Sequence, residues 1–281
     1  MLFNKQILVV INPEKDAQVA LDKAIRISER LDCVITALVR NKHAVPKLLT
    51  TLEQKLSVAA MKGIKVALEV SDETNLLRAI IRTQHAKGIG LVVKEPHAAS
   101  LTDQVFLPDD WKLLRNSRCP VLLVHADNDW DNSPVLLGVN ADPADSEHQT
   151  LNKRILVTGR FLSEVGSVQL NLVSAYPSMM QNADSEAQVP ALLEAQYRAA
   201  CRRLVADETF PDSQLHIDQG PPELLIPQVA EQIGARLLIL GTVARSGLQG
   251  VLLGNTAEQI LKQVKTDVLV LSASSKPSNK E

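Results

Sequence analysis

The sequence predicts an α/β protein built from two similar domains in tandem. First, its apolar runs are short, continuous and rich in β-branched residues, which is typical of parallel strands covered on both faces. Second, stretches with helical spacing separate these runs, so strands and helices alternate along the chain. Third, the same order of runs starts again after residue 134, and 281 residues are enough for two domains with a core each.

Five strands are expected in the first half, with helices between them. The apolar runs that predict the strands are residues 6–12, 34–39, 64–70, 91–93 and 121–124. Apolar residues recur at helical spacing in the three stretches 15–31, 46–62 and 73–87. We therefore expect a five-stranded, mostly parallel sheet that is flanked by helices.

The second half repeats this order with an offset that grows along the chain. The offset in residue number is 128 at the first strand and 147 at the last two, as three pairs of runs show: 8–12 with 135–140, 91–93 with 237–240, and 121–124 with 268–271. We expect the extra residues mainly in the loop at 177–189, whose Ser, Gln, Asn and Asp are poor core formers. The polar segment 127–134 predicts a linker, which gives domains at 1–127 and 132–275.

The composition excludes several classes of protein. Lys and Arg number 30 against 32 Asp and Glu, so no basic stripe for coating nucleic acid is expected. Aromatic residues make up 3%, too few for a base-stacking platform, and no apolar stretch approaches the ~20 residues of a membrane-spanning helix. No cationic and apolar leader precedes the first strand, and Cys33, Cys119 and Cys201 lie far apart. We therefore expect a cytoplasmic protein.

Residues 240–258 carry the pattern of a phosphate-binding loop between a strand and a helix. At the end of the strand, Gly241 has no Cβ to keep a ligand away from the backbone. The free N–H groups of a helix that starts near Gly254 and Asn255 attract phosphate, and Arg245 can add a charged contact. The alternative is an ordinary loop and helix cap, because Asn255 is a good N-cap and Glu258 completes a capping box.

The same segment resembles the universal stress protein family. Many members of that family have a glycine, two residues, a second glycine, nine residues and then Gly-Ser or Gly-Thr, and they bind ATP there. Gly241 and Gly254 match the first and third positions, whereas Ala244 stands at the second, and Asn255 and Thr256 follow. The resemblance covers nearly the whole chain and implies two tandem domains of the adenine-nucleotide-alpha-hydrolase-like fold.

The resemblance implies that ATP or a related adenine nucleotide binds in the second half. The residues expected to form this site are Asn140, near the nucleoside, and Gly241, Ala244, Arg245, Gly254, Asn255 and Thr256, around the phosphates. Members that bind ATP usually carry an Asp after the first strand. Both halves have Asn there, at Asn12 and Asn140, which can hydrogen-bond but contributes no charge.

The first half is expected to bind no nucleotide. At the offset of 147, Lys94 takes the place of Gly241, and Pro108 begins the helix that would face phosphate. Pro108 lacks an N–H donor, and Asp109 and Asp110 place carboxylates at the positive end of the helix dipole. A triphosphate would therefore meet like charge.

No other motif predicts catalysis. The six histidines show no metal-ligand spacing, and the sequence has neither a GxxxxGK[ST] loop nor a GxSxG elbow. Asp142, Asp145 and Glu147 are interpreted as caps of the following helix rather than as a metal or acid–base site. We expect a stress-response protein that binds rather than transforms its ligand. A ligand-free interaction scaffold and a slow nucleotide hydrolase stay open.

The last strand of each half, 121–124 and 268–271, is expected at a sheet edge, where unpaired backbone groups invite pairing. Single-domain members of the family commonly dimerise through their last strands. The resemblance therefore implies that the two halves form an internal pseudo-dimer. A homodimer and an unidentified protein partner stay open, whereas nucleic acid and a membrane span are not expected.

Overall fold

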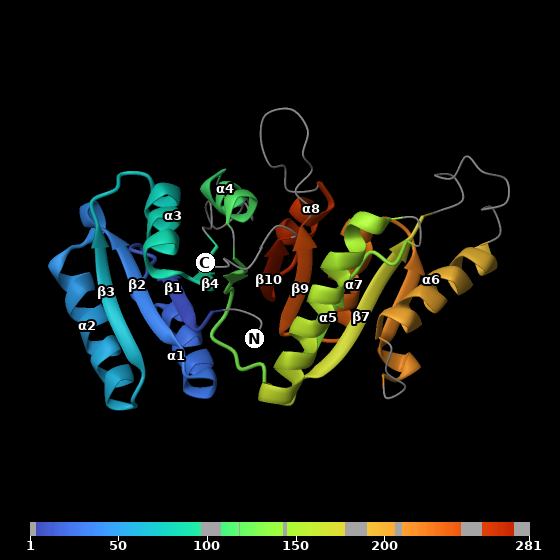
Figure 1. Cartoon of the computed structure of the whole chain (residues 1–281), viewed down its shortest axis with the longest axis horizontal. Helices are drawn as coiled ribbons and strands as arrows, with labels where there is room; N and C mark the ends of the chain where they lie inside the picture. Colours follow the sequence, from blue (N-terminus) through green and yellow to red (C-terminus); the bar gives the residue numbers. More distant parts are fainter. Residues whose placement is uncertain are drawn as a thin grey trace, which may run out of the picture. The chain divides into compact units, whose positions relative to one another are not determined.

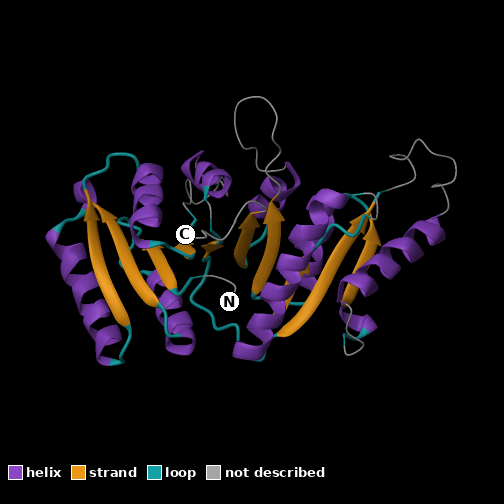
Figure 2. Ribbon diagram, viewed as in Figure 1, coloured by secondary structure: helices purple, strands orange, loops and turns teal. Residues whose placement is uncertain are grey.

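A computed structural model of the chain divides into two compact units, Met1–Asp127 and Asn128–Glu281 (Figure 1). It describes residues 4–96, 108–117, 119–142, 145–177, 190–205, 210–242 and 255–272. Each unit contains five strands flanked by helices (Figure 2), and every strand pairing described within a unit is parallel. The predicted fold class, an α/β fold with a mostly parallel sheet, is confirmed.

In unit 1 the strand order is β3-β2-β1-β4-β5. The strands are β1 (Gln6–Val10), β2 (Val34–Arg40), β3 (Lys65–Ser71), β4 (Leu91–Lys94) and β5 (Val121–Leu123). The helices are α1 (Val19–Leu31), α2 (Pro46–Met61), α3 (Leu76–Lys87) and α4 (Pro108–Asn116), with a short 3-10 turn at Asn41–His43. All five predicted strands and the three predicted helices are therefore present.

In unit 2 the strand order is β10-β9-β6-β7-β8, which has the same connectivity. The strands are β6 (Pro134–Gly138), β7 (Gln169–Tyr176), β8 (Leu215–Gln219), β9 (Leu237–Thr242) and β10 (Asp267–Ser272). The helices are α5 (Ser146–Gly166), α6 (Pro190–Val205), α7 (Pro222–Gln232) and α8 (Asn255–Gln263), with a 3-10 turn at Asp212–Gln214.

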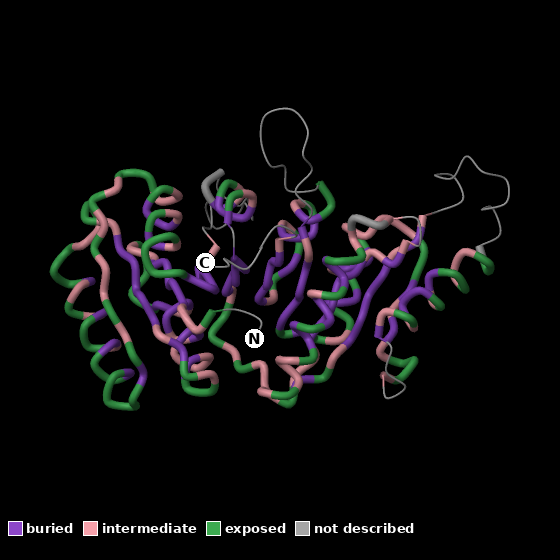
Figure 3. Tube along the Cα trace, in the orientation of Figure 1, coloured by how far each residue is buried: buried purple, intermediate pink, exposed green. Residues whose placement is uncertain are grey.

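The central strands are buried on both faces, as their continuous apolar runs predicted (Figure 3). Ile7, Leu8 and Val9 of β1 have no exposed surface, and neither do Leu136 and Leu137 of β6. Such strands cannot carry polar side chains along their length, because an unpaired buried polar group costs about 1–3 kcal/mol. In β1 and β6 the polar side chains therefore stand at or beyond the strand ends.

The repeat found in the sequence recurs in the elements. The starts of β1 and β6, Gln6 and Pro134, differ by 128 in residue number, and the starts of α4 and α8, Pro108 and Asn255, differ by 147. The extra residues are shared more widely than expected, because α5 has 21 residues where α1 has 13. The loop that was expected to hold most of them lies at 177–189, and residues 178–189 are outside the described part of the chain.

Strand order reverses once in each unit, between β1 and β4 and between β6 and β9. After β1 the chain adds β2 and β3 on one side and then returns to place β4 on the other side. In open parallel sheets, ligands bind outside the carboxyl ends of the strands at such a reversal. The residues that follow β6 and β9 are therefore the first place to look for a site in unit 2.

The predicted linker is anchored to unit 2 through Trp130. Its indole Nε1 donates a hydrogen bond of 2.9 Å to Oδ2 of Asp267, a fully buried carboxylate at the start of β10. This contact gives a physical reason for the division of the chain before Trp130 rather than after it.

Trp130→Phe keeps an aromatic ring and removes the donor to Asp267. We expect the free energy of unfolding of unit 2 to fall by about 1–3 kcal/mol, because a buried carboxylate loses one hydrogen bond. Urea denaturation of the full chain, followed by circular dichroism, measures the change. An unchanged transition in the variant would show that this hydrogen bond does not hold the linker.

Candidate functional site

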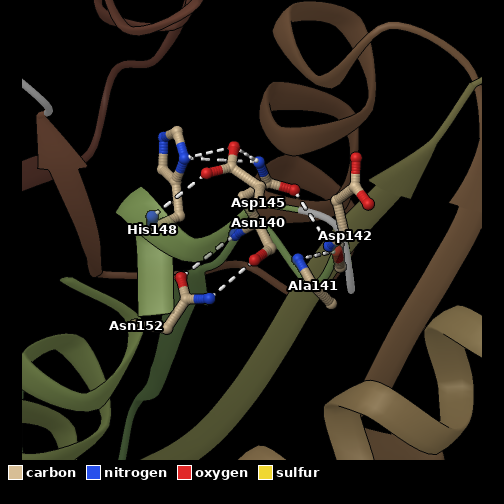
Figure 4. Close-up of polar contacts among 7 residues, drawn as sticks. Asn140, Ala141, Asp142, Asp145, His148 and Asn152 are labelled. Carbon is tan, nitrogen blue, oxygen red and sulfur yellow. Dashed lines mark hydrogen bonds and ion pairs between the residues drawn. The ribbon is translucent and has the colours of Figure 1, made fainter. Parts of the chain in front are cut away.

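A polar cluster follows β6 at the point where strand order reverses (Figure 4). The backbone N–H of Asn140 donates to Oδ1 of Asn152 (3.2 Å), and Nδ2 of Asn152 donates to the carbonyl oxygen of Asn140 (2.6 Å). Asn152 is a buried residue of α5. Its amide therefore satisfies both backbone groups of Asn140 and fixes that residue against the helix.

The Asn140 side chain shapes the turn that follows it. Its Oδ1 accepts from the backbone N–H of Asp142 (3.1 Å), which is an Asx turn, and its Nδ2 donates to Oδ2 of Asp145 (2.9 Å). An amide group has two donors and an acceptor with two lone pairs. Asn140, the residue expected near a nucleoside, is thus held in one orientation by its own turn.

Asp145 caps helix α5, as its interpretation from sequence predicted. Its Oδ1 accepts from the backbone N–H of His148 (3.2 Å), three positions further along the chain, and its Oδ2 lies 2.5 Å from Nδ1 of the same histidine. No role for His148 was predicted from the sequence. The signal that could have found it is the spacing Asp-x-x-His at a helix start, because side chains of the cap and of the third helical residue meet there.

The carboxylates of this cluster influence Tyr197 of α6. Burial, with smaller contributions from Asp142 and Asp145, raises the pKa of Tyr197 to about 12. Burial likewise raises the pKa of the nearby Cys201 thiol to about 12. Both groups therefore stay protonated near neutral pH, and neither supplies an anionic nucleophile.

Gly241 of β9 packs against helix α5. A Cβ at Gly241 would lie 2.3 Å from Cγ and Cδ2 of Leu151, so the Leu151 side chain fills the space that a larger residue would need. This glycine was expected to leave room for a ligand. In the structure the direction of the missing Cβ is occupied by the protein itself.

The other residues of the predicted phosphate loop are only partly described. Ala244, Arg245 and Gly254 lie outside the described residues. Asn255 is the first residue of α8, so the helix begins where the sequence predicted, and the capping role of Asn255 stays a prediction. The side chains of Asn255 and Thr256 are both exposed at the helix start.

Unit 1 builds the same turn with different residues. Asn12 follows β1, its Oδ1 accepts from the backbone N–H of Glu14 (3.0 Å), and its own N–H donates to Oε1 of Gln18 (3.2 Å). Nε2 of Gln18 donates to the Asn12 carbonyl oxygen (2.8 Å). The buried Gln18 therefore does for Asn12 what Asn152 does for Asn140.

The strand registers correct the alignment of the two halves by one position. Val10 of β1 pairs with Lys94, and Gly138 of β6 pairs with Leu240. Val10 and Gly138 are equivalent, because each is the fifth and last residue of its strand, so Lys94 corresponds to Leu240. The equivalent of Gly241 is then Glu95, and not Lys94 as the constant offset suggested.

Two ion pairs occupy the reversal point of unit 1. Nζ of Lys94 lies 2.6 Å from Oδ1 of Asp110 in α4, and the two side chains are 3% and 0% exposed. Nζ of Lys15, which follows β1, lies 2.8 Å from Oε2 of Glu95, which follows β4. The Glu95 side chain is 1% exposed, so its carboxylate is buried at this edge of the sheet.

Comparison with known proteins agrees with this architecture. A sequence model of the Universal stress protein family matches residues 165–272. A universal stress protein E homolog from Haemophilus influenzae is 30% identical, and the match covers 99% of each chain. This chain belongs to the universal stress protein family. Universal stress protein E of Escherichia coli K12 is 27% identical over 96% of this chain and 95% of its own.

Solved structures of similar proteins span both units of this universal stress protein. A Pseudomonas aeruginosa PAO1 protein of unknown function has a TM-score of 0.82 and 35% identity, covering 95% of this chain and 92% of its own. A universal stress protein from Archaeoglobus fulgidus has a TM-score of 0.64 at 15% identity and shares the fold, covering 96% of this chain and 99% of its own. Among the helices of the described residues, none has the length and apolar character that a bilayer crossing requires.

The buried pair Lys94–Asp110 makes a prediction for stability. Lys94→Met and Asp110→Leu, made separately, each remove one charge of a buried pair, so each is expected to lower the free energy of unfolding of unit 1, by up to about 3–5 kcal/mol. The double variant removes both charges and is expected to lose far less. Urea denaturation of the three variants measures this coupling. Losses that simply add in the double variant would contradict the pairing.

The packing of Gly241 makes a second prediction. Gly241→Ala forces a Cβ into Leu151 and is expected to lower the free energy of unfolding of unit 2 by about 1–3 kcal/mol. Adding Leu151→Ala opens space for that Cβ, so the double variant is expected to be more stable than the sum of the single losses. Urea denaturation of these variants measures the free energies of unfolding. Gly241→Ala at full stability would contradict a packing role.

Proposed function

We propose that this universal stress protein binds ATP or a related adenine nucleotide at the carboxyl ends of β6 and β9, and that unit 1 binds none. The observation that carries the proposal is the contrast between the two reversal points. In unit 1 the buried pair Lys94–Asp110 and the buried Glu95, paired with the half-exposed Lys15, fill the edge. In unit 2 the positions of Lys94 and Asp110 are taken by the buried apolar residues Leu240 and Ala257.

The start of α8 supports a phosphate at this edge. A helix begins with N–H groups that have no partner in the helix, and its dipole makes this end positive. Asp109 and Asp110 stand at the start of α4, whereas Asn255 and Thr256 stand at the start of α8 and add no charge. Ala244, Arg245 and Gly254 complete the proposed phosphate loop, and Asn140 lies at the nucleoside end.

The proposal includes how the protein works in the cell. Binding rather than turnover of the nucleotide would make it a cytoplasmic regulator in a stress response. The two halves would form an internal pseudo-dimer through residues 121–124 and 268–271. A homodimer and a separate protein partner remain alternatives to that arrangement, and a ligand-free scaffold remains the alternative to nucleotide binding.

Asn255→Asp tests the proposed phosphate site in the full chain. The new carboxylate suits a helix start but repels phosphate, so we expect ATP affinity to fall at least about fivefold while stability is kept. Isothermal titration calorimetry with ATP is expected to give one site per chain before the substitution.

Asn75→Asp is the matched control, because Asn75 caps helix α3 in unit 1 and its side chain accepts from the backbone N–H of Arg78. Asp caps a helix equally well, so this variant adds the same charge at a helix start away from the proposed site. Equal losses in both variants, or two sites per chain, would contradict the proposal. A chain that binds neither ATP nor adenosine would favour the ligand-free scaffold.

A further inference from the structure

His148 lies in the first turn of α5, on the face that spans both strand ends of the candidate site. Residues three and four apart share one face of a helix, so His148, Leu151 and Asn152 form a row. Leu151 contacts Gly241 of β9, and Asn152 holds Asn140 after β6. His148 is one turn closer to the helix start. Its side chain therefore stands just beyond the carboxyl ends of these two strands.

The position of the proton on this histidine follows from Asp145. Nδ1 of His148 lies 2.5 Å from Oδ2 of Asp145, and Oδ1 of the same carboxylate accepts the backbone N–H of His148. An ionised carboxylate only accepts hydrogen bonds, so Nδ1 carries the proton. In the neutral ring, Nε2 then presents a lone pair and acts as an acceptor.

The other ring nitrogen has no partner within the described part of the chain. In Figure 4 Nδ1 faces the Asp145 carboxylate, its hydrogen-bond acceptor, and Nδ2 of Asn140 lies 3.5 Å from the same nitrogen. The His148 side chain is 27% exposed, so a ligand can reach Nε2. Asp145 orients the ring, and Nε2 of the partly exposed His148 is available as an acceptor.

The charges around this nitrogen select what it can bind. Asp142 and Asp145 are carboxylates of the same turn, and they disfavour a phosphate next to them. Phosphate oxygens also offer no proton to an acceptor. The hydrogen-bond donors of an adenine nucleotide are the ribose hydroxyls and the 6-amino group of the base, all on the nucleoside. The start of α8, the helix that follows β9 in the chain, is the better place for the phosphates.

We propose that Nε2 of His148 accepts a hydrogen bond from a donor group of the nucleoside, either a ribose hydroxyl or the adenine 6-amino group. Asp145 is the positioning residue, since it fixes the tautomer and the orientation of the ring. The inference rests on the proposed function, because it assigns a contact within the same nucleotide site.

His148→Asn and His148→Gln separate the two nitrogens in the full-length chain. The Asn amide can still donate to Asp145 from near the position of Nδ1 but places nothing at Nε2. The Gln amide reaches toward Nε2. We expect His148→Asn to weaken ATP binding about three- to tenfold by calorimetry, the effect of one hydrogen bond, and His148→Gln to keep most of the affinity. Thermal unfolding of both ligand-free variants is expected to match the parent chain.

Nucleotide analogues identify the donor and need no folded variant. Calorimetry compares ATP with 2′-deoxyATP, 3′-deoxyATP and inosine triphosphate, which lacks the 6-amino group. The parent chain is expected to bind one of these analogues about three- to tenfold more weakly than ATP, and His148→Asn is expected to bind that analogue and ATP equally. A merely structural histidine would not change this discrimination.

Two results would overturn the proposal while leaving the proposed function intact. One is a parent chain that binds ATP and all three analogues equally. The other is a His148→Asn variant that keeps both the affinity and the discrimination of the parent chain. Absence of ATP binding in the parent chain would overturn the proposed function and this contact together. The titration of the parent chain with ATP, made for the Asn255→Asp comparison, detects that case.

Discussion

The central strands β1 and β6 are apolar and buried, which leaves polar groups at their ends, and the candidate site depends on that constraint. β1 and β6 are covered completely, so the chain must change abruptly from apolar strand to polar turn at Asn12 and Asn140. A backbone that leaves a buried strand still needs partners for its N–H and C=O groups. Gln18, the N-cap residue of α1, and Asn152 of α5 supply them, and each thereby fixes where the polar edge begins.

The two units solve the same problem at this edge in different ways. Unit 1 places the ion pairs Lys15–Glu95 and Lys94–Asp110 at this edge, so these two cations and two anions balance one another. Unit 2 has apolar residues in place of the central pair and a helix start without carboxylates at its first two residues. Glu258 is the acidic residue in the first turn of that helix, at its fourth position, so no carboxylate stands at the first two residues, where phosphate would bind.

Much of the fold could be predicted from the sequence, but less of the site could. The spacing of apolar residues reveals strands and helices directly, whereas contacts between distant residues have no such local pattern. The continuous run at 6–12 predicted β1. Nothing local marks Lys94 and Asp110 as partners, because they belong to different elements, β4 and α4, that meet only in the folded unit. A lone histidine such as His148 is usually a surface residue, and only the cap at Asp145 gives it an orientation. Caps and Asx turns are therefore the part of a site that sequence can reveal.

The buried ion pair of unit 1 also makes single substitutions at this edge costly in free energy of unfolding. Replacing one partner of a buried ion pair costs about 3–5 kcal/mol, whereas replacing both by apolar residues is often neutral or stabilising. A domain stabilised by about 5–15 kcal/mol tolerates few such single losses. Converting this edge of unit 1 to the form of unit 2 would require Lys94 and Asp110 to be replaced together, because replacing either one alone destabilises the unit. The cost of an unpaired buried charge therefore separates the two forms of this edge.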